Sequence, residues 1–204
     1  PEFFDLLKHC VDTGTAKDIV LEVTTNATKI HPRFFDLAKQ FKHLSMTISM
    51  DGVGKTYEYV RYPANYDTVY KNIVRYNEFV KSLGGDSRLI FNFVLQIWNL
   101  HNAVDVFKTL GPLAINSNGG YVMIEELENP VFMQWKMLPE DYIKDVIKQL
   151  VKEKSINHPQ SVSWPIIAFS KMLEANKVYR TKDHNYKKDQ LLKFMHKQDA
   201  HRGI

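Results

Sequence analysis

The sequence predicts an α/β fold built on a parallel β-sheet. Short apolar runs rich in β-branched residues alternate with segments of helical periodicity, and four runs have the character of strands: 19–23, 44–50, 89–97 and 121–127. Successive runs begin 25, 45 and 32 residues apart. A parallel crossover needs about a dozen residues or more, whereas a hairpin needs only a few. The four strands are therefore expected to be parallel, with helices between them.

Helical patterns fill most of the remaining chain. Glycines and prolines are expected to end several of these helices, at Gly14, at Gly84 and at Gly111-Pro112. The expected helices are 3–11, 32–41, 69–83, 103–110 and 139–150, and only helical patterns follow Trp164. The stretch 53–63 is expected to be irregular, and 116–120 is expected to be a turn.

Composition excludes several classes of protein. The 204 residues are 44% hydrophobic and 25% charged, which is typical of a globular domain and not of a disordered, collagen-like or coiled-coil chain. The single cysteine, Cys10, cannot form an intrachain disulfide or a cysteine-based zinc site, and this favours a reducing, cytoplasmic location. No apolar run approaches the roughly 20 residues that span a bilayer, so no membrane partner is expected.

The positive charge is concentrated at the carboxyl end. Residues 177–204 hold eight Lys or Arg against three Asp, while the net charge of the whole chain is +4. A solvated helical end explains this distribution, and a contact with nucleic acid is the alternative.

Polar side chains follow each predicted strand. Such residues are common in turns and helix caps, but the carboxyl ends of parallel strands meet at one edge of the sheet, where ligands bind. The polar residues are Thr24, Thr25 and Asn26; Ser49 and Asp51; Gln96 and Asn99; and Glu125, Glu126 and Asn129. Trp98 stands at the third strand end, where its ring could stack on a flat ligand. The row predicts a ligand site.

Residues 49–56 end in Gly-Lys-Thr after a strand and so resemble a phosphate-binding P-loop. The first glycine of that motif falls at Ser49, and Pro63 interrupts the helix that should begin at Gly54. A P-loop NTPase is therefore not expected. The Gly-x-Ser-x-Gly and His-Glu-x-x-His signatures of hydrolases are absent as well.

Five segments of the chain form a recognisable series: Pro-x-Phe-Phe-x-Leu-Leu at 1–7, Thr-Thr-Asn-Ala-Thr at 24–28, Ile-Ser-Met-Asp-Gly at 48–52, Tyr-Glu-Tyr-Val-Arg-Tyr-Pro at 57–63 and Asn-Ile at 72–73. Taken together, they resemble the radical S-adenosylmethionine (radical SAM) enzymes, in the branch with a twitch or SPASM accessory domain. The resemblance covers roughly residues 1–130 in unbroken order.

This resemblance implies a partial (β/α)6 TIM-like barrel of which the chain holds strands three to six, followed by C-terminal helices. Residues 1–160 would be the carboxyl part of the barrel and residues 161–204 a helical basic extension. The Cys-x-x-x-Cys-x-x-Cys motif that holds a 4Fe-4S cluster in the family would lie upstream of Pro1, so the chain is expected to be a fragment without metal ligands of its own.

The resemblance also implies a role for seven residues in binding S-adenosylmethionine. Thr25 and Asn26 would line the mouth of the third barrel strand, Ser49 and Asp51 would reach the ribose hydroxyls, Arg61 would pair with the carboxylate, and Gln96 and Asn99 would lie near the ribose and adenine. Two structural alternatives stay open: Asp51-Gly52 is also a plain turn sequence, and Arg61 could pair with Glu58 across one helical turn.

The implied function is generation of a 5′-deoxyadenosyl radical that modifies a substrate, expected to be a peptide, with a reductant for the cluster as a further partner. The chain alone is expected to be inactive because the cluster ligands are missing from it. Two other functions remain open: a non-catalytic α/β ligand-binding module, and an RNA-modifying enzyme that uses the basic tail.

Overall fold

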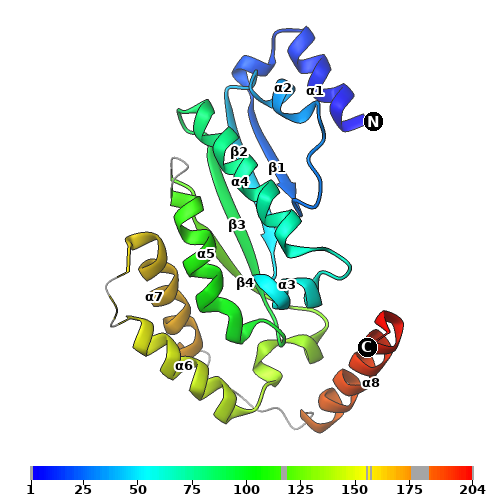
Figure 1. Ribbon diagram of the computed structural model, residues 1–204, viewed down its shortest axis with the longest axis vertical. Helices are drawn as coiled ribbons and strands as arrows, with labels where there is room; N and C mark the ends of the chain where they lie inside the picture. Colours follow the sequence, from blue (N-terminus) through cyan, green and yellow to red (C-terminus); the bar gives the residue numbers. More distant parts are fainter. Residues whose placement is uncertain (1, 116–118, 155, 157, 176–183, 204) are drawn as a thin grey trace.

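The computed structural model describes residues 2–115, 119–154, 156, 158–175 and 184–203 (Figure 1). Four parallel strands form one sheet in the order β1-β2-β3-β4. The strands are β1 (Val20–Thr25), β2 (His43–Met50), β3 (Arg88–Leu95) and β4 (Val122–Glu126). The predicted parallel α/β fold is confirmed. Each strand is added to the same side of the one before it, and the sheet is open, with β1 and β4 as its edges in the described part of the chain.

Helices make up most of the rest of the chain. The α-helices are α1 (Glu2–Asp12), α2 (Phe34–Ala38), α3 (Gly54–Val60), α4 (Tyr66–Leu83), α5 (Ala103–Ile115), α6 (Glu140–Lys154), α7 (Gln160–Ala175) and α8 (His184–Arg202). Short 3-10 turns are η1 (Ala16–Asp18), η2 (Leu100–Asn102), η3 (Val131–Met133) and η4 (Trp135–Met137). None of the helices in the described ranges is long and apolar enough to cross a membrane.

Three details of the predicted helices are wrong. The stretch expected to be irregular contains α3, because Tyr57 is fully buried there and anchors a helical turn in the core. The helix expected to end at Gly111-Pro112 continues to Ile115, since packing of Leu110 and Ala114 outweighs the loss of the Pro112 donor. The helix α2 ends at Ala38 rather than at residue 41. The predicted turn at 116–120 lies in part outside the described residues.

One face of the sheet, the helix-covered face, carries the hydrophobic core. Residues aligned across the strands, such as Ile48, Phe91 and Val122, point to this face and are buried. The helices α4 and α5 lie over it (Figure 1). A fully buried side chain of this size contributes about 1.5–3 kcal/mol, so the row of such residues fixes the sheet against its helices.

The opposite face, here called the open face, is largely polar. It carries polar residues and some apolar ones, which alternate along the strands with the core residues, among them Thr24, Thr47, Ser49, Asn92 and Glu125, and Ile90, Val94 and Met123. Parallel sheets usually bear apolar residues on both faces because helices cover both. The open face is therefore unusually polar for a parallel sheet.

The helix layer extends beyond the sheet. Phe107 of α5 packs edge-on against Phe169 of α7 with ring centroids 5.7 Å apart, and Ile166 and Leu173 of α7 are buried in the same core. The division of the chain at residue 160 stays a prediction, although α7 packs with the main core. The helix α8 lies at the carboxyl edge of the sheet, where Phe194 contacts Phe132 of η3 (Figure 1).

We expect Phe91→Ala to lower the free energy of unfolding by about 3–5 kcal/mol, because the ring is fully buried at the centre of the sheet and its removal leaves a cavity. Urea denaturation followed by circular dichroism measures this loss. Glu22→Gln, at an exposed position on the open face, is the control and should change stability by less than about 0.5 kcal/mol. Equal losses in the two variants would contradict the assignment of the core face.

Candidate functional site

An ion pair stands at the carboxyl end of β2. The Arg61 guanidinium, which follows α3, donates from Nε to Oδ2 of Asp51. Asp51 is only 6% exposed, and burial raises the pKa of its carboxyl, while the charge and hydrogen bond of Arg61 act in the opposite direction. The resemblance to radical SAM enzymes predicts both residues in one site, and the structure brings them into contact.

The alternative pairing of Arg61 with Glu58 is wrong. Glu58 instead accepts a hydrogen bond from Lys55 Nζ at 2.8 Å and another from the Tyr66 backbone N–H at 3.1 Å. These two bonds lower the pKa of Glu58. The guanidinium of Arg61 is thus directed to the sheet and not along its own helix.

Asn99 ties the ends of β2 and β3 together. Its side chain is completely buried and donates from Nδ2 to the carbonyl oxygens of Asp51 at 3.2 Å and Val94 at 2.8 Å. Its Oδ1 accepts from the Gln96 backbone N–H at 2.8 Å. Each bond satisfies a backbone group that would otherwise be buried without a partner, so Asn99 sets where Asp51 and Gln96 lie.

The turn after β2 depends on a glycine and a second asparagine. Asn102 Oδ1 accepts the Val53 backbone N–H at 2.6 Å. Gly52 has φ of 143°, and a Cβ at this position would lie 2.9 Å from Asn102 Oδ1. The Asp51-Gly52 pair is therefore a turn, as the structural alternative proposed, and also part of the site through the Asp51 side chain.

The turn after β2 resembles a P-loop in sequence, but its backbone and lysine do not make the contacts of a P-loop. A helix, α3, does begin at Gly54, so the expectation that Pro63 prevents a helix there is wrong. The Val53 N–H is nevertheless already bonded to Asn102. Lys55 is almost fully exposed and pairs with Glu58. A P-loop requires backbone donors and a lysine directed at one phosphate, and these groups are directed elsewhere.

Three side chains on the open face carry polar groups that are not used within the described part of the protein. Ser49 is aligned directly with Asn92 of β3, and Gln96 follows β3 and continues the alternation of Asn92 and Val94. Asn92 donates to Glu125 Oε2 at 2.9 Å, but its Oδ1 is buried without a hydrogen-bond partner among the described residues. Within the same ranges, the Ser49 hydroxyl and the Gln96 side-chain amide form no hydrogen bond. An unsatisfied buried group costs about 1–3 kcal/mol, which a ligand could recover.

The residues at the end of β1 are engaged in local contacts. Thr25 Oγ1 accepts the Ala27 N–H at 3.1 Å, and its alignment with Ile48 places its side chain on the helix-covered face. Asn26 Oδ1 accepts from the backbone N–H and the hydroxyl of Thr28, at 3.1 and 2.8 Å. Both lie at the carboxyl edge, as predicted, but their polar groups serve the turn.

The structure thus divides the seven predicted residues into three groups at one edge of the sheet. Ser49 and Gln96 present uncommitted groups; Asp51, Arg61 and Asn99 are bonded within one network; and Thr25 and Asn26 form the β1 turn. Sequence reasoning missed Asn92 and Asn102. Asn92 could have been found as the single polar residue inside the apolar run of β3, whereas Asn102 gave no signal beyond its place in a turn.

Trp98 is covered by α8. Its ring stacks on Phe194 with centroids 6.1 Å apart and an interplanar angle of 28°, and Tyr59 contacts it edge-on. Arg202 of α8 lies over the rings of Tyr59 and Tyr62. The helix that carries the basic tail therefore packs against the edge of the candidate site, and its contact with nucleic acid stays a prediction.

No group of three or more His, Cys, Asp or Glu side chains in the described ranges could hold a metal ion. The resemblance places the ligands of the 4Fe-4S cluster outside this chain, and the cluster stays a prediction.

No family model matches the chain, and no curated protein matches it.

We expect the stability contributed by Asp51 to fall as the pH rises. Because burial raises its folded-state pKa above the ordinary value of 3.8, the folded protein holds the proton more tightly than the unfolded chain does. The contribution is complete below the unfolded pKa and is lost as the pH passes through the folded pKa. Urea unfolding of the protein and of Asp51→Asn between about pH 3 and pH 7 measures it.

The free energy of unfolding of the protein minus that of Asp51→Asn should be largest in acid and should decrease toward neutral pH. A difference that grows with pH would mean that the attraction of Arg61 outweighs burial at this carboxyl.

Proposed function

We propose that the carboxyl edge and open face of the sheet bind S-adenosylmethionine, and that the chain is the carboxyl part of a radical SAM domain that modifies a peptide. The proposal rests on one observation: the polar groups of Ser49, Asn92 and Gln96 that have no hydrogen-bond partner among the described residues lie on the face of the sheet opposite the main core, near the Asp51–Arg61 pair.

The arrangement of the sheet supports a barrel wall. In barrels of alternating strands and helices, consecutive strands are neighbours, the helices lie outside, and sites form at the carboxyl ends of the strands. The order β1-β2-β3-β4 with α4 and α5 on one face agrees with this arrangement. A doubly wound sheet would instead reverse its strand order and carry helices on both faces. In the proposed full-length protein the open face is the inner wall.

The chemistry of the open face suits the nucleoside of S-adenosylmethionine. The Ser49 hydroxyl can both donate and accept a hydrogen bond. The Gln96 side-chain amide donates from its nitrogen and accepts at its oxygen, and Asn92 Oδ1 accepts. These groups match ribose hydroxyls and the amino group of adenine. Asn99 takes a positioning role rather than a direct contact, because its three hydrogen bonds are all internal.

Arg61 suits the carboxylate of the ligand. A guanidinium has five N–H donors in a planar fork, and the bond to Asp51 uses only its Nε. The Arg61 side chain is 33% exposed, so its remaining donors can be approached from solvent. Asp51 would hold the fork in position for a ligand carboxylate.

A bound 4Fe-4S cluster would supply the electron that splits S-adenosylmethionine and produces the 5′-deoxyadenosyl radical. The residues of this chain would bind and orient the cofactor and exclude competing reactions. The proposed location is the reducing cytoplasm, which agrees with the free thiol of Cys10. A second candidate is a binding module that uses the same site without a cluster.

We expect Ser49→Ala to weaken binding of S-adenosylmethionine to this chain roughly 2- to 10-fold, because one hydrogen bond to a neutral group contributes about 0.5–1.5 kcal/mol. Isothermal titration calorimetry measures the affinity. Glu22→Gln, on the same face at the opposite end of the sheet, should bind like the unaltered chain. Absence of binding to the unaltered chain, or equal affinity in both variants, would contradict the proposed site.

The catalytic part of the proposal has a separate test in the full-length protein. After anaerobic reconstitution with iron and sulfide, we expect it to release 5′-deoxyadenosine from S-adenosylmethionine in the presence of a strong reductant. Arg61→Gln should lower the yield, because the cofactor carboxylate loses a charged partner. A full-length protein without the cysteine triad would leave the binding module as the function.

A further inference from the structure

The free edge of β4 offers backbone groups for a further strand. In the β3–β4 ladder, Tyr121 O accepts from Phe91 N at 3.0 Å and Leu127 N donates to Leu95 O at 3.0 Å. Since successive residues of a strand direct their N–H and C=O to alternate sides, the backbone groups of Val122 and Ile124 point away from β3. No strand or loop in the described ranges pairs with them.

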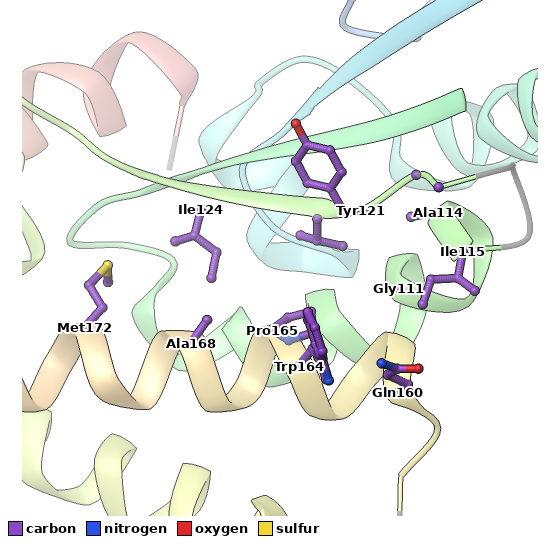
Figure 2. Close-up of a pocket in the computed structure, with 13 residues that line it drawn as sticks. Gly111, Ala114, Ile115, Tyr121, Ile124, Gln160, Trp164, Pro165, Ala168 and Met172 are labelled. Carbon is purple, nitrogen blue, oxygen red and sulfur yellow. The ribbon is translucent and has the colours of Figure 1, made fainter. Parts of the chain in front are cut away.

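A groove runs along this edge between β4 and α7. Figure 2 shows Ile124 pointing toward α7, while α7 presents side chains at four-residue intervals, which places them on one side of the helix. The groove has a volume of about 790 Å³ and is mostly apolar. We call it the strand groove and define it by Val122, Ile124, Gln160, Trp164, Ala168 and Met172.

Trp164 is a large aromatic residue that lines the groove and is largely exposed. Its side chain is 67% exposed, although the neighbouring Val162 and Ile166 of the same helix are buried against α5 and α6. Large aromatic residues in apolar clefts are typical anchors of interfaces. Trp164 lies on the part of α7 that extends past the edge of the sheet. A fifth strand added to β4 would therefore pack against this part of α7.

Acidic residues lie at the carboxyl end of the same strand. Glu125 and Glu128 are exposed there, beside a polar pocket of about 640 Å³ that also includes Lys136. Lys136 is already paired with Glu126 at 2.7 Å. The end of the strand groove therefore favours positive charge.

We propose that the strand groove binds an extended peptide that adds to β4 as a fifth strand, with alternate apolar side chains over Trp164 and Ala168 and a basic residue near Glu125 and Glu128. Backbone pairing along an edge supplies affinity in this mode of recognition, and pockets for alternate side chains supply specificity. The inference does not depend on S-adenosylmethionine binding, which occurs on the open face.

A second copy of the chain fits this edge less well. Pairing of two β4 strands about a two-fold axis would bring the α7 of the partner into the helix layer that the first α7 already occupies (Figure 2). A single extended peptide brings no helix and avoids this clash.

Fluorescence anisotropy with labelled synthetic peptides tests the proposal on the full 204-residue chain. The probes are Val-Thr-Val-Thr-Val-Lys-Lys and the reversed peptide Lys-Lys-Val-Thr-Val-Thr-Val, which distinguish parallel from antiparallel addition. We expect at least one probe to bind, and Ala168→Trp to weaken it at least about 10-fold by filling the groove, a loss equivalent to about 1.4 kcal/mol. Lys171→Trp, exposed on α7 outside the groove, is the matched control and should bind normally.

Two further measurements separate strand addition from simple apolar binding. Two probes are N-methylated at alternate residues, one at the odd positions and one at the even positions. One of the two should bind at least about 10-fold more weakly than the other, because it lacks the backbone N–H donors that pair with β4. Glu128→Gln should weaken the lysine probes and reduce their dependence on salt.

Failure of both probes to bind, or equal binding to Ala168→Trp in a folded variant, overturns the proposal. Equal binding of the N-methylated probes in both registers also overturns it. Concentration-dependent dimers that Ala168→Trp abolishes would show that a second copy is the occupant instead.

Discussion

The candidate site depends on the buried amide of Asn99. Its hydrogen bonds connect the end of β2 to the end of β3 through the backbone of Asp51, Val94 and Gln96, so the two strand ends are held in one arrangement. The Asp51 side chain can then meet Arg61, which follows α3, and Gln96 can face the open side. An amide is suited to this task because it donates and accepts without carrying a charge into the interior.

The largely polar open face is the feature of the fold that points to a binding function. A parallel sheet with polar residues on one face lacks the stabilisation that apolar packing against a second helix layer would give. Such a face is expected where it serves another purpose. Asn92 Oδ1 is a buried acceptor without a hydrogen-bond partner in the part of the chain that the structure describes, and such an acceptor opposes folding. Departures of this kind from the pattern of a packed core are expected where a protein binds something.

The sequence was a good guide to the strands and a partial one to the site. The four apolar runs gave the parallel sheet, because crossover length and β-branched content depend only on local residues. The extent of α5 could not be read in the same way, since the packing of Leu110 and Ala114 overrides the local effect of Pro112. The sequence indicates Asp51 and Gln96 at the ends of β2 and β3. It does not indicate which way each side chain points, and the Thr25 side chain bonds within its own turn. The strand groove had no counterpart in the sequence, because it arises where α7 extends past the sheet.

The order of the strands has a consequence for how the chain acquires its structure. Every strand pairs with the strand that precedes it in the sequence, so no pairing needs a segment from the far end of the chain. During synthesis on the ribosome, each new strand therefore finds its partner already made and adds to a growing template.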